Sequence, residues 1–269
     1  MMNLLLENQT KVQVLGSGSR GNATLIAGGN DVILVDAGLS GQELIHRLNS
    51  TGVTLDQLKG IILTHEHNDH VRGLKGLLKR KKIPVWGNEQ TISHLRTAGY
   101  QSDCWNLFST GGEFQLGNMF VRSFTVPHDA YDPCGFTVSV SGIHVGIVTD
   151  LGYWTTEVQQ AVCNCHILCL EANYDAHLLS EDTRRPWATK QRISARHGHL
   201  SNAQAAELLA SFKGRNSPLR HVFVGHMSED CNSPDLALSE IQRGIQAAGI
   251  DAVKVHLTYQ SKVSEPVVI

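Results

Sequence analysis

Residues 64–70 read Thr-His-Glu-His-Asn-Asp-His and directly follow the apolar run Gly-Ile-Ile-Leu at positions 60–63. The apolar run predicts a buried strand, and the polar stretch predicts the loop in which that strand ends. Such a loop places three imidazoles and one carboxylate in a small volume: His65, His67, Asp69 and His70. Imidazole and carboxylate groups are the ligands that hold catalytic zinc and related divalent metals. The first two side chains can face one ion and the last two a second, so the stretch predicts a metal-binding loop.

A pair of metal ions needs more donors than one loop can supply. Three later positions carry suitable side chains, each directly after a strand-like run: His128, Asp150 and His226. Strand ends present catalytic groups on a rigid scaffold. Taken singly, each position is typical of a satisfied histidine or a turn aspartate. Three in the same setting, downstream of the first cluster, favour a shared metal site.

The order His-x-His-x-Asp-His, followed by His, Asp and His at strand ends, resembles the metallo-β-lactamase superfamily of dinuclear hydrolases. The resemblance extends from Val12 to a last strand near Val253. It implies two divalent metal ions, zinc or manganese, and a set of ligands for each. One ion would be held by His65, His67 and His128, and the other by Asp69, His70 and His226. Asp150 would bridge the two ions, and Asp36 would orient the metal loop without binding metal.

Four further motifs resemble the YycJ/WalJ branch of this superfamily. They are Ser-Gly-Ser-Arg-Gly-Asn at 17–22, Leu-Glu-Ala-Asn at 170–173, Gly-His-Leu-Ser-Asn at 198–202 and Gly-His-Met-Ser-Glu at 225–229. That branch is associated with 5′→3′ exonuclease activity on DNA, which the resemblance therefore implies here. The chain reads Ser-Glu-Asp-Cys-Asn at 228–232, where the branch often carries Ser-Glu-Glu-Asn-Asn. This departure leaves the metal ligands intact.

Short strand-like runs alternate with helical patterns along the chain. Strands are predicted at 12–15, 23–27, 32–36, around 85, within 114–148, at 166–170 and at 221–224. Helices are predicted at 40–48, 74–82, 89–97, 155–161, 202–212 and 234–247. No Pro/Ser/Gly linker divides the sequence, so residues 1–269 are expected to form a single domain. Strands followed by helices, given twice along the chain, fit an α/β fold of two packed sheets with helices on both outer faces. This is the four-layer αββα sandwich that the resemblance to the metallo-β-lactamase superfamily implies.

The composition is that of a globular enzyme, with a hydrophobic fraction of 41%. The sequence contains no run of about eighteen apolar residues of the kind a membrane helix requires. Residues 1–7 are apolar but lack a basic leader, and we interpret them as neither a signal peptide nor an anchor. The six cysteines show no paired spacing, which favours reduced thiols. We therefore expect a cytoplasmic protein without a membrane partner.

Residues 16–21 read Gly-Ser-Gly-Ser-Arg-Gly and satisfy the Gly-x-Gly-x-x-Gly pattern of dinucleotide sites. That fingerprint must open a helix, whereas residues 23–26 continue as a strand, so a Rossmann site is not expected. The hydroxyls of Ser17 and Ser19 could still hold a phosphate of the substrate. The plain alternative is a tight turn that needs glycine at positive φ.

The expected chemistry follows from two adjacent cations. They lower the pKa of a shared water from about 15.7 toward ~7, which makes a metal-bridging hydroxide available at neutral pH. Asp69 is placed both to bind metal and to aim that hydroxide. His199 resembles a non-ligand histidine of tRNase Z-type phosphodiesterases, and would stabilise the phosphate or protonate the leaving group; a loop or helix-capping histidine is the alternative. Glu171 is either a partner that fixes an imidazole tautomer or a helix-start carboxylate.

The sequence constrains the substrate less tightly than the metal site. A formal net charge of −2 provides no global field for nucleic acid. Basic residues gather at 79–82 and, with Trp187, at 184–196, where Arg192 and Arg196 are candidate substrate contacts. A basic segment with an aromatic can track a phosphodiester backbone. The leading hypothesis is a phosphodiesterase or nuclease acting on DNA; the alternatives are hydrolysis of a small ester, thioester, lactone or lactam, and a non-catalytic regulatory module. Nothing indicates an oligomeric state.

Overall fold

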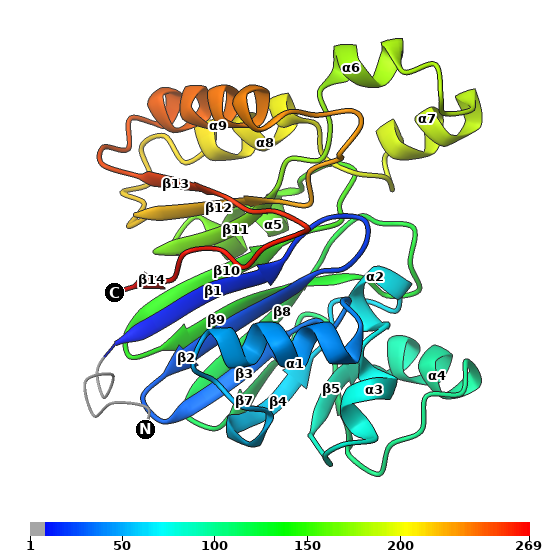
Figure 1. Cartoon of the computed structure of the whole chain (residues 1–269). Coiled ribbons are helices and arrows are strands. Elements are labelled where there is room, and N and C mark those ends of the chain that lie inside the picture. The colour runs from blue at the N-terminus through cyan, green and yellow to red at the C-terminus, as the bar shows by residue number, and fades with distance from the viewer. Residues whose placement is uncertain (1–8) are drawn as a thin grey trace.

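The computed structural model describes residues 9–269 and consists of two β-sheets packed face to face, with helices on both outer faces (Figure 1). Each sheet has seven strands. The prediction for residues 1–7 lies outside the described residues. Within residues 9–269, no helix is both long and apolar enough to cross a membrane.

The first sheet has the order β14-β1-β2-β3-β4-β5-β6. Its strands are β1 (Thr10–Gly16), β2 (Ala23–Gly28), β3 (Asp31–Val35), β4 (Leu58–Ile62), β5 (Val85–Asn88), β6 (Trp105–Phe108) and β14 (Val267–Val268). Strands β14 to β3 pair antiparallel, and β3 to β6 pair parallel. Parallel pairing requires crossovers. The helices of this half are α1 (Gly41–Ser50), η2 (Leu55–Gln57), α2 (Asn68–Val71), α3 (Leu74–Leu78) and α4 (Glu89–Thr97).

The second sheet has the order β13-β12-β11-β10-β9-β8-β7. Its strands are β7 (Glu113–Leu116), β8 (Met119–Thr125), β9 (Cys134–Val140), β10 (Ile143–Val148), β11 (Ile167–Glu171), β12 (His221–Gly225) and β13 (Lys254–Leu257). Strands β7 to β10 form an antiparallel meander, and β10 to β13 pair parallel. The helices of this half are α5 (Thr156–Val162), α6 (Ala176–Glu181), α7 (Trp187–Ser194), α8 (Asn202–Ala210) and α9 (Pro234–Ala248).

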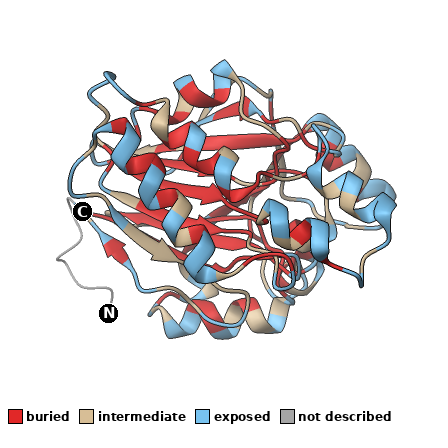
Figure 2. Cartoon of the chain, turned by 90° about the horizontal axis from the view of Figure 1, so that it is seen from above, coloured by how far each residue is buried: buried red, intermediate tan, exposed pale blue. Residues whose placement is uncertain are grey.

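Apolar side chains form three main core layers that explain the four-layer stack. The middle layer joins the inner faces of the two sheets, with Ile33 and Ile62 from the first and Phe136 and Phe223 from the second. The other two layers join each sheet to its outer helices. The central strands are therefore buried on both faces (Figure 2), which is why they read as continuous apolar runs.

The predicted αββα sandwich is confirmed. The helix predicted at 74–82 is shorter in the structure, where α3 ends at Leu78 and the chain turns before Pro84. The sequence reading missed α6 and α7, which form an arm that projects from the second half (Figure 1). It also ended the strands near Val253, whereas β14 returns to the first sheet beside β1. A two-residue strand has too little periodicity to be recognised without its partner.

Candidate metal centre

Most of the predicted metal ligands, and Asp36, lie where parallel strands end; His128 instead follows β8, which pairs antiparallel with β7 and β9. Asp36 follows β3, the loop 64–70 follows β4, Asp150 follows β10 and His226 follows β12. Carboxyl ends of parallel strands share one edge of a sheet, and ligands bind there in open α/β folds. Asp36, Asp150 and His226 also have positive φ angles of 62°, 59° and 52°. Non-glycine residues adopt this conformation rarely, and it concentrates at functional sites.

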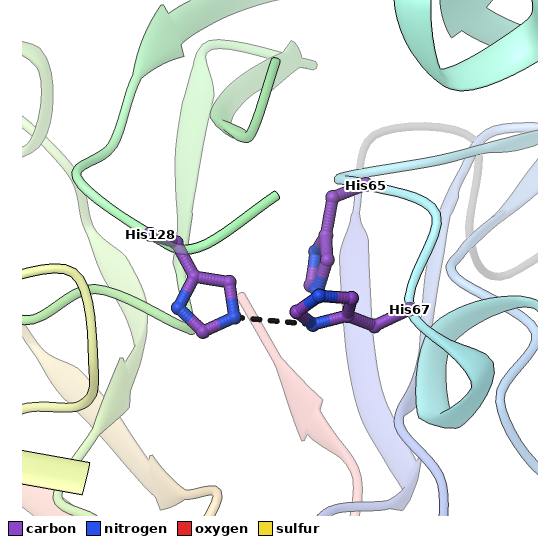
Figure 3. Close-up of side chains that lie close together, drawn as sticks. All are labelled: His65, His67 and His128. Atoms are coloured by element: carbon purple, nitrogen blue, oxygen red, sulfur yellow. Dashed lines mark hydrogen bonds between the residues drawn. The ribbon is translucent and has the colours of Figure 1, made fainter. Parts of the chain in front are cut away.

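The first donor group consists of His65, His67 and His128, whose rings converge from two loops (Figure 3). Their ligand atoms lie within 4.8 Å of one another, and Nε2 of His128 is 3.2 Å from Nδ1 of His67. Nδ1 of His128 lies 3.0 Å from the carbonyl oxygen of Gly198, which can only accept. That nitrogen therefore carries the proton, and Nε2 is left facing the group as an acceptor.

The fit of this group to a metal is tested by His65. Its Nε2 is buried and has no hydrogen-bond partner. A buried polar atom without a partner costs about 1–3 kcal/mol. Burial, followed by the neighbouring His70, also lowers the pKa of His65 well below its usual value, so the ring is held neutral with a free lone pair. A neutral imidazole with a free lone pair is the form that binds a divalent cation.

The second donor group consists of Asp69, His70 and His226, again with ligand atoms within 4.8 Å. Nε2 of His226 lies 3.4 Å from Oδ2 of Asp69. Asp150 lies between the groups: Oδ1 is 3.4 Å from Nε2 of His226, and Oδ2 is 3.0 Å from Nε2 of His70 but outside hydrogen-bond geometry. All seven predicted ligands therefore lie together, and their role as ligands stays a prediction.

Without metal, this site is balanced by protons. Burial alone would raise the pKa of Asp150, but the cationic forms of His226 and His70 hold it well below its usual value. Conversely, burial opposes protonation of His70 and His226, yet Asp150 and the other carboxylates raise the pKa of both rings well above 6.5. The site therefore stabilises positive charge next to Asp150. Divalent cations would replace those protons.

Asp36 and Glu171 hold the imidazoles from outside the donor groups. Oδ1 of Asp36 accepts from the Thr64 backbone at 2.9 Å, and Oδ2 lies 2.7 Å from Nδ1 of His70. Oε1 of fully buried Glu171 lies 2.7 Å from Nδ1 of His199 and 3.2 Å from Nδ1 of His226. Both carboxylates contact Nδ1, so Nε2 of His70, His199 and His226 is on the other side of the ring from them. These are the contacts expected of residues that fix an imidazole tautomer.

The site also contains residues that the sequence reading did not single out. Nδ2 of Asn22 lies 3.1 Å from Nε2 of His70 and 3.4 Å from Oδ2 of Asp69. Nδ2 of Asn173 donates to the carbonyl oxygen of His226 at 2.7 Å. Both asparagines end motifs that the sequence does display, at 17–22 and 170–173. Their position in those motifs was the available signal.

The Gly/Ser-rich loop joins β1 to β2 as a hairpin, which agrees with the rejection of a dinucleotide site. Ser17 is buried, and its hydroxyl accepts from the His226 backbone N–H at 2.7 Å. This contact supports the strand end that carries His226. Ser19 is exposed on the same loop. The predicted substrate contacts of both serines stay predictions.

His199 lies inside the site and not on a free surface loop. Besides Glu171, its Nδ1 is 3.5 Å from Oδ1 of Asp150, and its ring stacks on His226 with centroids 5.1 Å apart. Burial opposes its protonation, but the Glu171 carboxylate outweighs burial and raises the pKa of His199. The geometry suits an acid near the scissile bond and also a donor to metal, since His199 groups with Asp150, Glu171 and His226.

The basic segment 184–196 is largely neutralised within the chain. Arg184 and Arg185 form ion pairs with Asp182 and Asp230. Nε of Arg192 lies 2.6 Å from Oδ2 of Asp129, and the Arg196 guanidinium lies 4.5 Å from the Tyr153 ring centroid. The Arg192 pair brings α7 next to the loop that carries His128. At 79–82, Lys81 and Lys82 likewise contact Asp56 and Asp103.

Sequence comparisons agree with this geometry. The sequence model of the beta-lactamase superfamily domain matches residues 32–222, which include six of the seven predicted ligands and end before His226. An exodeoxyribonuclease YycJ of Bacillus anthracis is 31% identical over 251 residues, covering 91% of this chain and 94% of that protein. The chain belongs to the metallo-β-lactamase superfamily. An exodeoxyribonuclease WalJ of Streptococcus pneumoniae is 29% identical, covering 90% of this chain and 91% of that protein.

Solved metallo-β-lactamase structures support the same fold. The metallo-β-lactamase fold protein YhfI from Bacillus subtilis superposes with a TM-score of 0.74 at 17% sequence identity. The superposition covers 97% of this chain and 100% of YhfI. At this identity the likeness shows the fold alone. Together with the buried His/Asp clusters, membership in the family makes the chain a metal-dependent hydrolase of the metallo-β-lactamase superfamily.

Proposed function

We propose that this protein is a dinuclear phosphodiesterase that degrades DNA as a 5′→3′ exonuclease. The observation that carries the proposal is the pair of buried donor groups that meet at Asp150. His65, His67 and His128 would hold one ion, Asp69, His70 and His226 the other, and Asp150 both. The similarity to two proteins named exodeoxyribonucleases supports DNA as the substrate.

A bound pair of zinc or manganese ions would supply a hydroxide nucleophile near neutral pH and neutralise charge on the phosphate. The chain's own residues would then orient the nucleophile and protonate the leaving group. Asp69, whose side chain is partly exposed beside His226, would accept a hydrogen bond from the nucleophile and orient it. His199, fixed through Nδ1 by Glu171, would present Nε2 to the leaving oxygen and donate its proton.

The test of this function uses protein stripped of metal and reloaded with zinc or manganese. Duplex and single-stranded oligonucleotides labelled at either end are incubated beside a chromogenic phosphodiester and a thioester. Stepwise shortening of 3′-labelled strands, with immediate release of 5′-labelled mononucleotide, is the expected result. The Asp69→Ala variant lacks a proposed ligand and should not shorten the oligonucleotides; shortening by this variant would indicate a contaminating nuclease. Intact oligonucleotides with a cleaved thioester would overturn the nuclease proposal.

Hydrolysis of a small ester, thioester or lactone is the second candidate, favoured by the internal neutralisation of the 184–196 cations. Charge reversal at Arg192 and Arg196 separates the two. For a nuclease, kcat/KM on DNA should fall steeply and lose salt sensitivity, because phosphate contacts release counterions. Hydrolysis of a neutral ester should not change. The matched control reverses Lys213, exposed in the turn after α8, and Arg243, exposed on α9, and should leave both activities intact.

The role of His199 is tested by His199→Ala, with His197→Ala as the matched control because His197 is exposed. Loss of general acid catalysis should lower kcat about 10²–10⁴-fold while bound metal per chain is unchanged. If metal content falls with activity, His199 is a ligand. If both stay intact, it has neither role.

A further inference from the structure

A pocket of about 650 Å³ opens beside the first donor group and is not used by the proposed chemistry. Its lining includes Glu66, His67, Asn68, His94, Asp129 and Tyr131. Pockets that bind small ligands have volumes of ~300–1,000 Å³. Since His67 belongs to both the pocket and the donor group, an occupant would lie next to the reacting phosphate.

The charges of the pocket select against a phosphate. Two carboxylates line it, from Glu66 and Asp129. Within residues 9–269, Arg192 on α7 is the only lysine or arginine that pairs with Asp129. None of the residues that line the pocket, all of them in the described part of the chain, is a lysine or arginine. An anionic phosphate would be repelled there. An uncharged, planar part of the substrate would not.

Tyr131 provides the planar surface. It is 63% exposed, which is unusual for an aromatic residue beside a buried centre. Its backbone N–H donates to Oε1 of Glu66 at 3.0 Å, which ties its loop to the metal loop. The His94 ring packs against it with centroids 5.0 Å apart and planes at 35°. Glu66 therefore fixes the backbone of Tyr131, His94 supports its ring on one side, and the ring remains largely accessible.

We propose that Tyr131 is the stacking platform for the nucleobase next to the scissile phosphate, an inference that rests on the proposed nuclease function. Base stacking on aromatic side chains tolerates every base, because every base has a π-face. The pocket would therefore position the terminal nucleotides without reading their sequence. Glu66 acts as a positioning residue, because it fixes the Tyr131 backbone relative to His65 and His67.

The experiment combines two tyrosine variants with two substrates. Oligonucleotides carry either a normal base or an abasic site, placed in turn at the first and second nucleotides. On the normal substrate, Tyr131→Ala should lower kcat/KM about 5- to 150-fold, and Tyr131→Phe should retain wild-type activity because it keeps the ring. At one of the two abasic positions, the loss caused by Tyr131→Ala should disappear. Phe120→Ala is the control, since Phe120 is 62% exposed on β8 and outside the pocket.

A binding measurement gives a second readout without turnover. In the Asp69→Ala background, 2-aminopurine at the same nucleotide should lose fluorescence on binding and regain it when Tyr131 is also replaced by alanine. An equal loss of kcat/KM on base-containing and abasic substrates would overturn the inference but leave the nuclease function standing. Failure of the wild-type protein to shorten any oligonucleotide would overturn both.

Discussion

The strand-end cluster around Asp150 and the α6–α7 arm are both rich in ionisable side chains, and they balance charge differently. In the cluster, the groups are buried, and Nε2 of His65 has no partner. In the arm, the arginines are exposed or partly exposed and are already paired with carboxylates, as Arg185 is with Asp182 and Asp230. A buried set of donors that includes an atom without a partner is consistent with a bound cation, whereas a paired surface set has no such atom to satisfy. The comparison teaches that the two regions differ in whether their polar atoms have partners, and not in how many ionisable side chains they contain.

The largest effect should come from Asp150→Asn. The amide keeps the size of the side chain but removes the negative charge between the two donor groups. We expect kcat/KM on a phosphodiester to fall about 10³-fold, as when one electrostatic stabiliser is lost, together with bound metal measured by mass spectrometry. Asp251→Asn, at an exposed carboxylate, is the control. Full metal content with activity within tenfold of wild type would mean that the cluster is not the reactive region.

Glu171→Gln should have the next largest effect, because Glu171 orients His199 and His226 without facing the reaction itself. Loss of such an outer partner lowers metal affinity or activity about 10–100-fold. Titration of the apo-variant with zinc against a competing chelator, beside Glu207→Gln as an exposed control, measures this directly. Unchanged zinc affinity combined with unchanged kcat would exclude the orienting role.

Metal removal should destabilise the cluster in a pH-dependent manner. In the metal-free protein the pKa values of His70 and His226 are raised, so their pairing with Asp150 is fully present below about pH 6.5 and is lost as pH rises through the folded pKa values. Metal must displace those protons, so it should stabilise more at pH 8 than at pH 6. At a free metal concentration a hundredfold above Kd, binding should stabilise the folded protein by about 2.7 kcal/mol and raise Tm by ~5–10 °C. An equal Tm increase at both pH values would contradict this linkage.

The smallest effect should come from the arm. Arg184→Gln removes a cation that is exposed to solvent and already paired with the carboxylates of Asp182 and Asp230. We expect no measurable change in the salt dependence of DNA binding. Arg192→Gln, beside the His128 loop, should reduce the slope of log K against log salt by about 1. Equal slopes of log K against log salt for the two variants would mean that Arg192 contacts DNA no more than Arg184 does.

The sequence predicted the fold and the composition of the candidate site because both depend on local patterns. Continuous apolar runs such as 60–63 identify strands buried on both faces. Polar residues directly after those runs identify the strand ends that converge at one edge. His65, His128 and Asp150 could be read in this way even though they are far apart in the chain. The resemblance of the motifs to a known family added which of these side chains are expected to share a metal ion.

The tertiary structure alone decided which donors lack hydrogen-bond partners and which cations form ion pairs within the chain. The Arg192–Asp129 and Arg185–Asp230 pairs join residues 63 and 45 positions apart. The pocket beside His67 is formed by α4 and the 128–131 loop, and no local pattern links them. Sequence periodicity reports what is buried because burial follows from apolar side chains at regular spacing. Satisfaction of charge depends on distances between distant segments, which only the folded chain defines.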